Sequence, residues 1–279
     1  MAIARSFLAR TSAVAVLALG LAACSSDADA PATSSTTPAA GGADTSLTDV
    51  EERGSIIVGT EGTYRPFSFH EDGAGDLTGY DVEVITAVAE EMGLEVQFEE
   101  TQWDAIFAGL EAGRFDVIAN QVSITPDREG SYTFSEPYTI STGVVVVPED
   151  NTDITSFADL SGKRTAQSLT SNWKALAEES GAQIEGVEGW AQAATLVQQG
   201  RVDATINDKL TFLDYQQQQG GDTGLKIAAE TEDTSRSAFA FARGDEALAA
   251  AVDEALATLA EDGTLTEISE KYFGADVSK

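Results

Sequence analysis

The sequence predicts an α/β fold built as two lobes of like topology. Segments with strand and helix periodicity alternate along residues 54–279. GRFDVIANQ at 113–121 and GRVDATIND at 200–208 also match in pattern at an offset of 87 positions, and similar helical segments, AIFAGLEA and AATLVQQ, precede them. Two copies of one helix, glycine cap and buried strand predict two related lobes. A chance match in so short a window is the alternative.

The first half alternates strand and helix. An apolar run at 56–58 is typical of a buried strand, and apolar residues at helical spacing predict a helix over 80–92 that ends at Gly93. Alternating apolar residues from 94 to 98 predict a strand, and a helix over 103–112 stops at Gly113.

The second half repeats this alternation. A valine run at 144–147 predicts a strand, and helices are expected over 191–199, 247–260 and 265–272. The alternation is typical of an α/β protein rather than of separate α and β domains.

The N-terminal segment has the features of an export signal. Arg5 and Arg10 precede an apolar stretch at 13–21 that is short for a membrane-spanning helix, and Leu-Ala-Ala-Cys closes it at Cys24. This resembles a bacterial lipoprotein signal, which implies cleavage after residue 23, lipidation of Cys24 and anchoring on the outer face of the cytoplasmic membrane. Because Cys24 is the only cysteine, no disulfide within the chain is expected, and thiol catalysis is not expected either.

Residues 24–46 are rich in Ser, Thr, Ala, Pro, Gly and Asp, and predict a disordered tether. The formal net charge is −31, and loss of two arginines with residues 1–23 makes it −33. So acidic a protein is a poor partner for nucleic acid or for an anionic lipid surface.

Three polar residues suggest a binding cleft between the lobes. Ligands of open α/β sheets bind beyond the carboxyl ends of strands, where Gln121 and Asp208 are expected, one in each lobe, with Arg128 of NQVSITPDR just beyond the first strand. A guanidinium and a carboxylate on opposite walls fit the two charges of a zwitterion. The alternatives are a surface ion pair of Arg128 with Asp127 or Glu129 and a helix N-cap at Asp208.

Several motifs in one order resemble a known family. GTEGTYRPFSF (59–69), GYDVEV (79–84), NQVSITPDR (120–128), SEPYTIS (135–141) and YFGADVSK (272–279) resemble the solute-binding proteins of polar amino acid ABC importers, known as family 3. The resemblance runs from about Gly54 to Lys279, and within the family it looks most like the cystine-binding proteins.

The resemblance implies a two-lobed periplasmic-binding-protein fold of type II, each lobe a mixed sheet with helices. Lobe 1 would comprise residues 54–139 and 238–279, and lobe 2 residues 143–235. Two extended crossovers near 140–142 and 236–237 would form the hinge.

By position, the resemblance implies three kinds of ligand contact. Tyr64, Phe67 and Trp103 are similar to the family's aromatic residues that flank the ligand. The stretch Gln121, Val122 and Ser123 is similar to the stretch that contacts the ligand's α-amino and α-carboxyl groups. Ser171 and Asn172 are similar to a helix start whose amides contact the carboxylate. Arg128 and Asp208 fall on the family's two charged clamps. Glu61 could meet a second ammonium, as in cystine. The alternatives are core packing for Phe67 and an exposed surface carboxylate for Glu61.

The resemblance implies a monomeric, extracytoplasmic binding protein that delivers a polar amino acid to an ABC permease. No cofactor, metal site or catalytic residue is expected, because one His and one Cys do not suffice for the usual constellations. Cystine is the favoured ligand; glutamine, glutamate and other polar amino acids remain alternatives. A dehydratase-like enzyme or a sensory module on the same fold is a further alternative.

Overall fold

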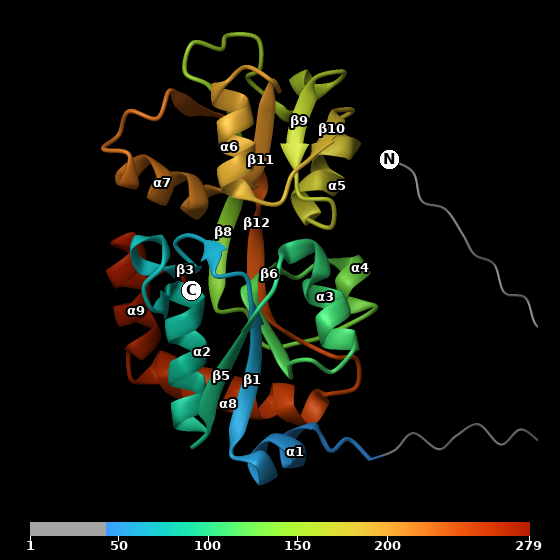
Figure 1. Ribbon diagram of the computed structural model, residues 1–279, viewed down its shortest axis with the longest axis vertical. Coiled ribbons are helices and arrows are strands. Elements are labelled where there is room, and N and C mark those ends of the chain that lie inside the picture. Colours follow the sequence, from blue (N-terminus) through green and yellow to red (C-terminus); the bar gives the residue numbers. More distant parts are fainter. Residues whose placement is uncertain (1–42) are drawn as a thin grey trace, which may run out of the picture. The chain divides into compact units, whose positions relative to one another are not determined.

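The computed structural model describes residues 43–279 (Figure 1). The expected signal peptide, Cys24 and most of the expected tether lie outside the described residues, so the interpretations placed on them stay predictions. None of the helices described has the length and apolar character needed to cross a membrane.

One nine-stranded mixed sheet runs through both lobes in the order β10-β9-β11-β8-β12-β6-β1-β5, with β7 paired to β12. Its strands are β1 (Ser55–Thr60), β5 (Glu95–Glu100), β6 (Val117–Ser123), β7 (Thr133–Phe134), β8 (Thr139–Pro148), β9 (Arg164–Gln167), β10 (Gln183–Gly186), β11 (Ala204–Asp208) and β12 (Leu225–Phe241). A small second sheet contains β2 (Thr63–Tyr64), β3 (Ser68–His70) and β4 (Leu77–Thr78).

Helices cover this sheet in both lobes (Figure 1). They are α1 (Ser46–Arg53), α2 (Tyr80–Glu91), α3 (Trp103–Glu111), α4 (Pro126–Glu129), α5 (Asn172–Glu179), α6 (Trp190–Gln198), α7 (Lys209–Gln218), α8 (Glu246–Glu261) and α9 (Thr264–Phe273), with 3₁₀ turns η1 (Glu71–Gly73) and η2 (Phe157–Leu160). The strands and helices expected from periodicity are confirmed, with ends within a few residues of the structure.

The sequence repeat is confirmed as a structural repeat. Its two copies form β6 and β11; each pairs with one parallel and one antiparallel neighbour. Asp116 and Asp203 have the same role in the two lobes. Asp116 Oδ2 accepts the N–H of Ile57 at 2.7 Å, and Asp203 Oδ2 accepts the N–H of Arg164 at 2.7 Å. The shared sequence pattern therefore reflects a shared local structure.

Helix α1 was not expected from the sequence. Val50 in this helix is 1% exposed and joins the lobe 1 core, while Arg53 pairs with Asp116. Asp44 and Ser46 accept the backbone N–H groups of Ala247 and Leu248 at the start of α8. The last residues of the expected tether therefore hydrogen-bond to the start of α8, about 200 positions later in the sequence. The folded body thus begins near residue 44.

Strands β8 and β12 pass from one lobe to the other (Figure 1). They pair antiparallel from Thr139↔Ser237 to Thr142↔Thr234, and the register shifts between Glu230 and Thr234. The crossovers expected at 140–142 and 236–237 lie in or beside this paired stretch, where a change of bend would alter the opening between the lobes.

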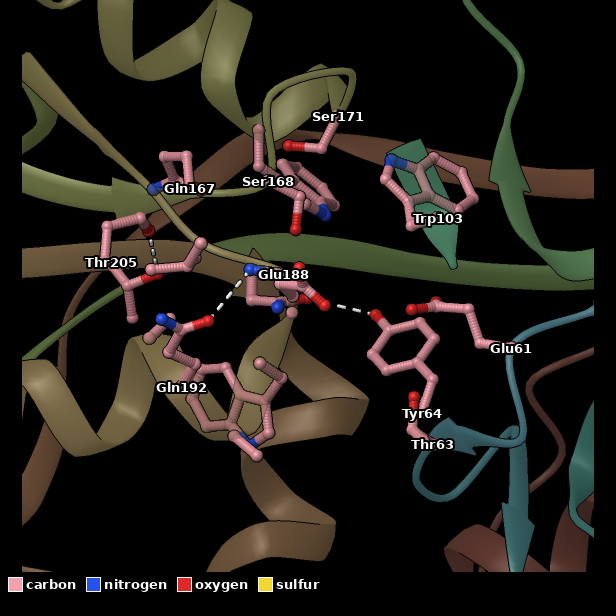
Figure 2. A pocket seen from close by; sticks show the side chains of 18 of the residues that line it. Glu61, Thr63, Tyr64, Trp103, Gln167, Ser168, Ser171, Glu188, Gln192 and Thr205 are labelled. Atoms are coloured by element: carbon pink, nitrogen blue, oxygen red, sulfur yellow. Dashed lines mark hydrogen bonds between the residues drawn. The ribbon is translucent and has the colours of Figure 1, made fainter. Parts of the chain in front are cut away.

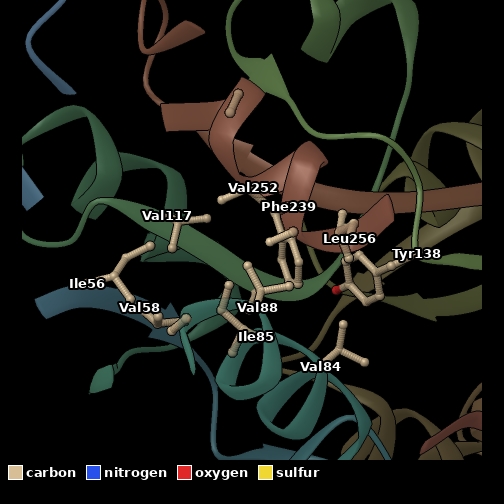
Figure 3. Close-up of a cluster of buried hydrophobic side chains, with 14 of the residues drawn as sticks. Ile56, Val58, Val84, Ile85, Val88, Val117, Tyr138, Phe239, Val252 and Leu256 are labelled. Carbon is tan, nitrogen blue, oxygen red and sulfur yellow. The ribbon is translucent and has the colours of Figure 1, made fainter. Parts of the chain in front are cut away.

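Each lobe has its own core. In lobe 1, side chains of β1, α2, β6 and α8 pack together (Figure 3): Ile56, Val58, Val84, Ile85, Val88, Val117, Val252 and Leu256, with Tyr138 stacked on Phe239. In lobe 2, two clusters centre on the valines of β8, with Phe212 in one and Ile206 in the other. Separate cores allow each lobe to remain rigid while the polar faces between them change distance.

Candidate functional site

A cavity of about 270 Å³ lies between the lobes. Figure 2 shows Glu61, Tyr64 and Trp103 on the lobe 1 side and Gln167, Thr205 and Gln192 on the lobe 2 side. The lining also includes Gln102 and Gln121 from lobe 1, and residues 166–168, 171–173, 187–193 and 205–207 from lobe 2. A molecule in this cavity would contact both lobes at once.

Glu61 is placed in the lobe 1 wall by Asn120 of β6. Asn120 Nδ2 donates to Glu61 Oε2 at 2.7 Å, and Asn120 Oδ1 accepts the Glu61 N–H at 2.9 Å. Burial raises the pKa of Glu61 to about 7, although the Asn120 hydrogen bond acts in the lowering direction. Glu61 forms no ion pair within residues 43–279 and is not an exposed surface carboxylate.

Gln121 has a backbone φ of 50°, which is unfavourable for a residue other than glycine. Asp81, fully buried in the first turn of α2, holds this conformation: its carboxylate accepts the Gln121 N–H at 2.7 Å and Gln121 Nε2 at 2.6 Å. Burial raises the pKa of Asp81 to about 7. Gln121 Oε1 is left buried without a partner in the described structure. This oxygen is an acceptor available to a ligand.

Arg128 lies beside the cavity as a partly buried cation. Its Nη1 donates to Ser123 O at 3.0 Å and its Nη2 to Thr170 O at 3.2 Å, while the guanidinium carbon lies 5.4 Å from the Trp103 ring centre and 5.2 Å from that of Phe107. None of the ion pairs among residues 43–279 includes Arg128, so the expected alternative of a surface pair with its neighbours is wrong. Burial lowers the pKa of Arg128 to about 10, which leaves it charged at neutral pH.

Asp208 caps α7 and also lies at the lobe boundary. Its Oδ1 accepts the Leu210 N–H at 2.8 Å and the Ser141 hydroxyl at 2.7 Å. The N-cap alternative is therefore confirmed, but Oδ2 accepts no hydrogen bond from the described part of the chain. Burial raises the pKa of Asp208 to about 6. One residue can thus cap a helix and still present a free carboxylate oxygen.

Direct contacts hold the lobes together around the cavity. The Tyr64 hydroxyl donates to Asn207 Oδ1 at 3.1 Å and lies 3.0 Å from Thr211 Oγ1. Asp104 Oδ1 accepts both the N–H and the hydroxyl of Thr170, at 3.0 and 2.8 Å. These bonds join residues of lobe 1 to residues of lobe 2, so the lobes have closed on each other.

The expected site residues fall into three groups. Glu61, Tyr64, Trp103, Gln121, Ser171 and Asn172 line the cavity. Arg128, Asp208 and Ser123 lie outside its lining, with Arg128 bonded to Ser123 O. Phe67 and Val122 are fully buried, and Phe67 belongs to the lobe 1 core against Tyr64, Tyr80 and Phe273, as its alternative interpretation held.

Sequence reasoning did not select Asp81, Asn120, Gln167, Trp190 or Asn207. Asn120 and Asn207 occupy matching places in the repeat, and that match was the available signal for them. Asp81 lies in the quoted GYDVEV motif. For Gln167 and Trp190 the sequence offers no local signal, because their role depends on where the lobe 2 loops bring them.

The chain matches the family model described as bacterial extracellular solute-binding proteins, family 3, over residues 56–275, and it belongs to this family. It is 54% identical to the L-cystine-binding protein TcyA of Bacillus subtilis, over 82% of this chain and 85% of that protein. It is 52% identical to a probable amino-acid ABC transporter-binding protein of Haemophilus influenzae, over 82% of this chain and 89% of that protein.

Two solved structures bear on the arrangement of the lobes. The L-cystine solute receptor of Neisseria gonorrhoeae, unliganded and open, is 45% identical, with a TM-score of 0.57 over 84% of this chain and 99% of that chain. An ancestral arginine-binding protein bound to arginine is only 33% identical, yet its TM-score is 0.74 over 80% and 99%. The better fit to a ligand-bound structure agrees with the direct contacts between the lobes.

Proposed function

We propose that this protein is the extracytoplasmic binding component of an ABC importer and that it captures cystine between its lobes for delivery to the permease. Its similarity to a cystine-binding protein and to an amino-acid ABC transporter-binding protein supports the transport role and the ligand. Because these relatives are described as binding proteins, they also support a role without catalysis.

The observation on which the proposal depends is the set of unpaired buried charges around one cavity. Within residues 43–279, Arg128 is a partly buried cation without an anion, and the partly buried Glu61 and the buried Asp208 are carboxyl groups without a cation. Unpaired buried charges destabilise a protein unless a ligand supplies the partners. An amino acid supplies both signs.

Each charged group of the ligand has a partner in this arrangement. Arg128 takes the α-carboxylate together with the N-terminal amides of α5, which Ser171 caps through the Lys174 N–H at 3.1 Å. Asp208 takes the α-ammonium, with Gln121 Oε1 as a further acceptor. Glu61 takes a second ammonium, which cystine has and glutamine lacks.

The aromatic residues at the lobe 1 wall flank the ligand. Each charge-assisted hydrogen bond contributes roughly 1.5–3 kcal/mol, and several of them with ring contacts reach the ~8–10 kcal/mol of micromolar or tighter binding after ordering costs. Tyr64 and Trp103 line the cavity and supply this contact area. Phe67 and Val122 support the wall from behind, and Ser123 holds Arg128 through its carbonyl oxygen.

Closure follows from the placement of these partners on different lobes. A ligand that contacts both walls binds the closed form more tightly than the open form, and this difference shifts the population toward closure. The closed form then docks on the permease. Lipidation at Cys24, with the residues from 24 to about 43 as a tether, would keep the protein near that permease as a membrane-anchored monomer.

A ligand screen tests the proposal. The protein lacking residues 1–42 is titrated calorimetrically with cystine, glutamine, glutamate, arginine and the other common amino acids. Cystine is expected to bind at micromolar concentration or below, and the other amino acids at least tenfold more weakly. Tighter binding of any one-headed amino acid than of cystine would reject cystine as the ligand while leaving the amino acid class intact.

A further inference from the structure

The lobe 2 wall of the cavity contains hydrogen-bond donors that the near head of a bound amino acid does not use. The near head is the end whose α-carboxylate and α-ammonium are assigned to Arg128 and Asp208. Gln167 Nε2 and Trp190 Nε1 are buried, and neither has a partner within the described chain. Gln167 is 3% exposed, and both residues line the cavity. A buried donor without an acceptor is destabilising. Two of them at one wall indicate that a bound molecule supplies the acceptor.

The start of helix α6 adds further donors at the same place. Gln167 is the last residue of β9, and its carbonyl accepts the Val187 N–H at 3.1 Å, so the loop leading into α6 runs beside it. Residues 187–193, which include the first turn of α6, line the cavity. No side chain caps α6 at Gly189, and its first turn has no acidic residue. Its first N–H groups and the positive end of its dipole therefore favour an acceptor with negative charge.

The surrounding charges define what kind of anion fits. No lysine or arginine lines the cavity, whereas Glu61 lies in the opposite wall and Glu188 is exposed at the lobe 2 side. A free anion such as phosphate would be repelled by these acids. A carboxylate with an ammonium on the neighbouring carbon avoids this repulsion, because its ammonium faces Glu61 while its oxygens face the donors.

We infer that Gln167, Trp190 and the start of α6 form a second carboxylate subsite, which binds the far head group of a two-headed amino acid. This inference rests on the proposed function and specifies how cystine is distinguished from one-headed amino acids. At the near head, the charged partner of the carboxylate, Arg128, belongs to lobe 1 and that of the ammonium, Asp208, to lobe 2. At the far head, the carboxylate faces the donors of lobe 2 and the ammonium faces Glu61 of lobe 1. Both heads then bridge the lobes, and a ligand without the far carboxylate loses one of the two bridges.

The test compares two ligands on three proteins. L-cystine and the mixed disulfide of L-cysteine with cysteamine, which keeps the far ammonium but lacks the far carboxylate, are titrated into wild type, Gln167→Leu and Trp190→Phe. Wild type is expected to bind cystine about 10–100-fold more tightly than the mixed disulfide. Each variant should lose about 10-fold or more for cystine, and less than about 3-fold for the mixed disulfide.

Gln183→Leu is the matched control, because it makes the same chemical change in lobe 2, at an exposed residue of β10 that does not line the cavity. It should bind cystine within about 2-fold of wild type. Thermal melts of the ligand-free variants check their folding, and the wild-type ligand comparison stands even if a variant fails to fold.

If wild type binds the two ligands with equal affinity, or if the variants lose equal affinity for both, the second carboxylate subsite is rejected. The proposal that the protein binds cystine for transport would not be affected. If cystine does not bind, and a one-headed amino acid binds equally well to wild type and to Gln167→Leu, both the second subsite and the proposal of cystine as the ligand are rejected. Tight binding of a different diamino dicarboxylic acid, lost in Gln167→Leu, would support the subsite and reject only cystine.

Discussion

Replacement of Arg128 by methionine should strongly weaken ligand binding and leave the stability of the ligand-free protein nearly unchanged. The guanidinium is partly buried beside Trp103 and Phe107, and its only bonds within residues 43–279 are to the carbonyl oxygens of Ser123 and Thr170. Methionine keeps most of the side-chain volume and removes the charge.

The magnitudes follow from these contacts. Loss of a two-point hydrogen bond to a ligand carboxylate, at roughly 1.5–3 kcal/mol per bond, gives a fall in affinity of about 10²–10⁴-fold. Loss of the two carbonyl bonds costs about 1–3 kcal/mol of folding free energy, but removal of a buried charge without an anion returns a similar amount. The free energy of unfolding without ligand should therefore change by less than about 1 kcal/mol.

Calorimetric titration with cystine measures the first quantity, and urea unfolding without ligand measures the second. Binding within about threefold of wild type would refute the carboxylate assignment. A loss of about 3 kcal/mol or more in unfolding free energy, together with weakened binding, would instead mark Arg128 as a structural residue.

Three other predictions follow from the site. Asp208→Asn should weaken binding of amino acids more than of their deaminated analogues by calorimetry; an equal loss would contradict its pairing with the ammonium. Asp104→Ala removes two bonds to Thr170, so cystine affinity should fall about 3–10-fold and the ligand-free protein should become more extended in small-angle scattering; unchanged dimensions and affinity would show that this contact does not favour closure. The third concerns pH. Because burial raises the folded-state pKa of Glu61 from 4.5 to about 7, the folded protein binds more protons than the unfolded chain between these values. The free energy of unfolding without ligand should thus fall as pH rises from about 5 to above 7, whereas cystine affinity should rise as the carboxylate ionises. Glu61→Gln should make both profiles less steep, with the remaining slope due to Asp81 and Asp208, whose pKa values burial also raises. Profiles identical to wild type would reject Glu61 as a titrating group.

The alternation of elements and the two-lobed plan could be predicted because they depend on local patterns. Apolar spacing in α2 and α8, and glycines after α3 and α6, are features of short windows that hold in almost any tertiary context. The repeat relates two such windows. In the structure each copy pairs with one parallel and one antiparallel strand, and each has an aspartate that accepts a backbone N–H of a neighbouring strand. Helix α1 escaped prediction because it lacks a strong pattern and depends on packing against α8.

The candidate residues of the site could be selected from the sequence where a motif marks them, but not where only the convergence of distant elements brings them together. Arg128 and Asp208 stand out by charge at strand ends, whereas Gln167 and Trp190 are ordinary residues until β9 and α6 bring their donors to one wall. Phe67 is the opposite case. It was selected from the sequence because it lies in the motif GTEGTYRPFSF, but it packs into the lobe 1 core.

The sequence by itself determined the class of fold, the repeated half and the family, and it singled out Arg128 and Asp208 as candidate ligand contacts, since each of these depends on residue type and short spacing. Only the tertiary structure decided which polar atoms lack partners and face each other. Tyr64 and Asn207, bonded at 3.1 Å, are 143 positions apart. Burial and pairing depend on such distant neighbours, and these decide whether a carboxylate is a helix cap, a surface charge or part of a ligand site.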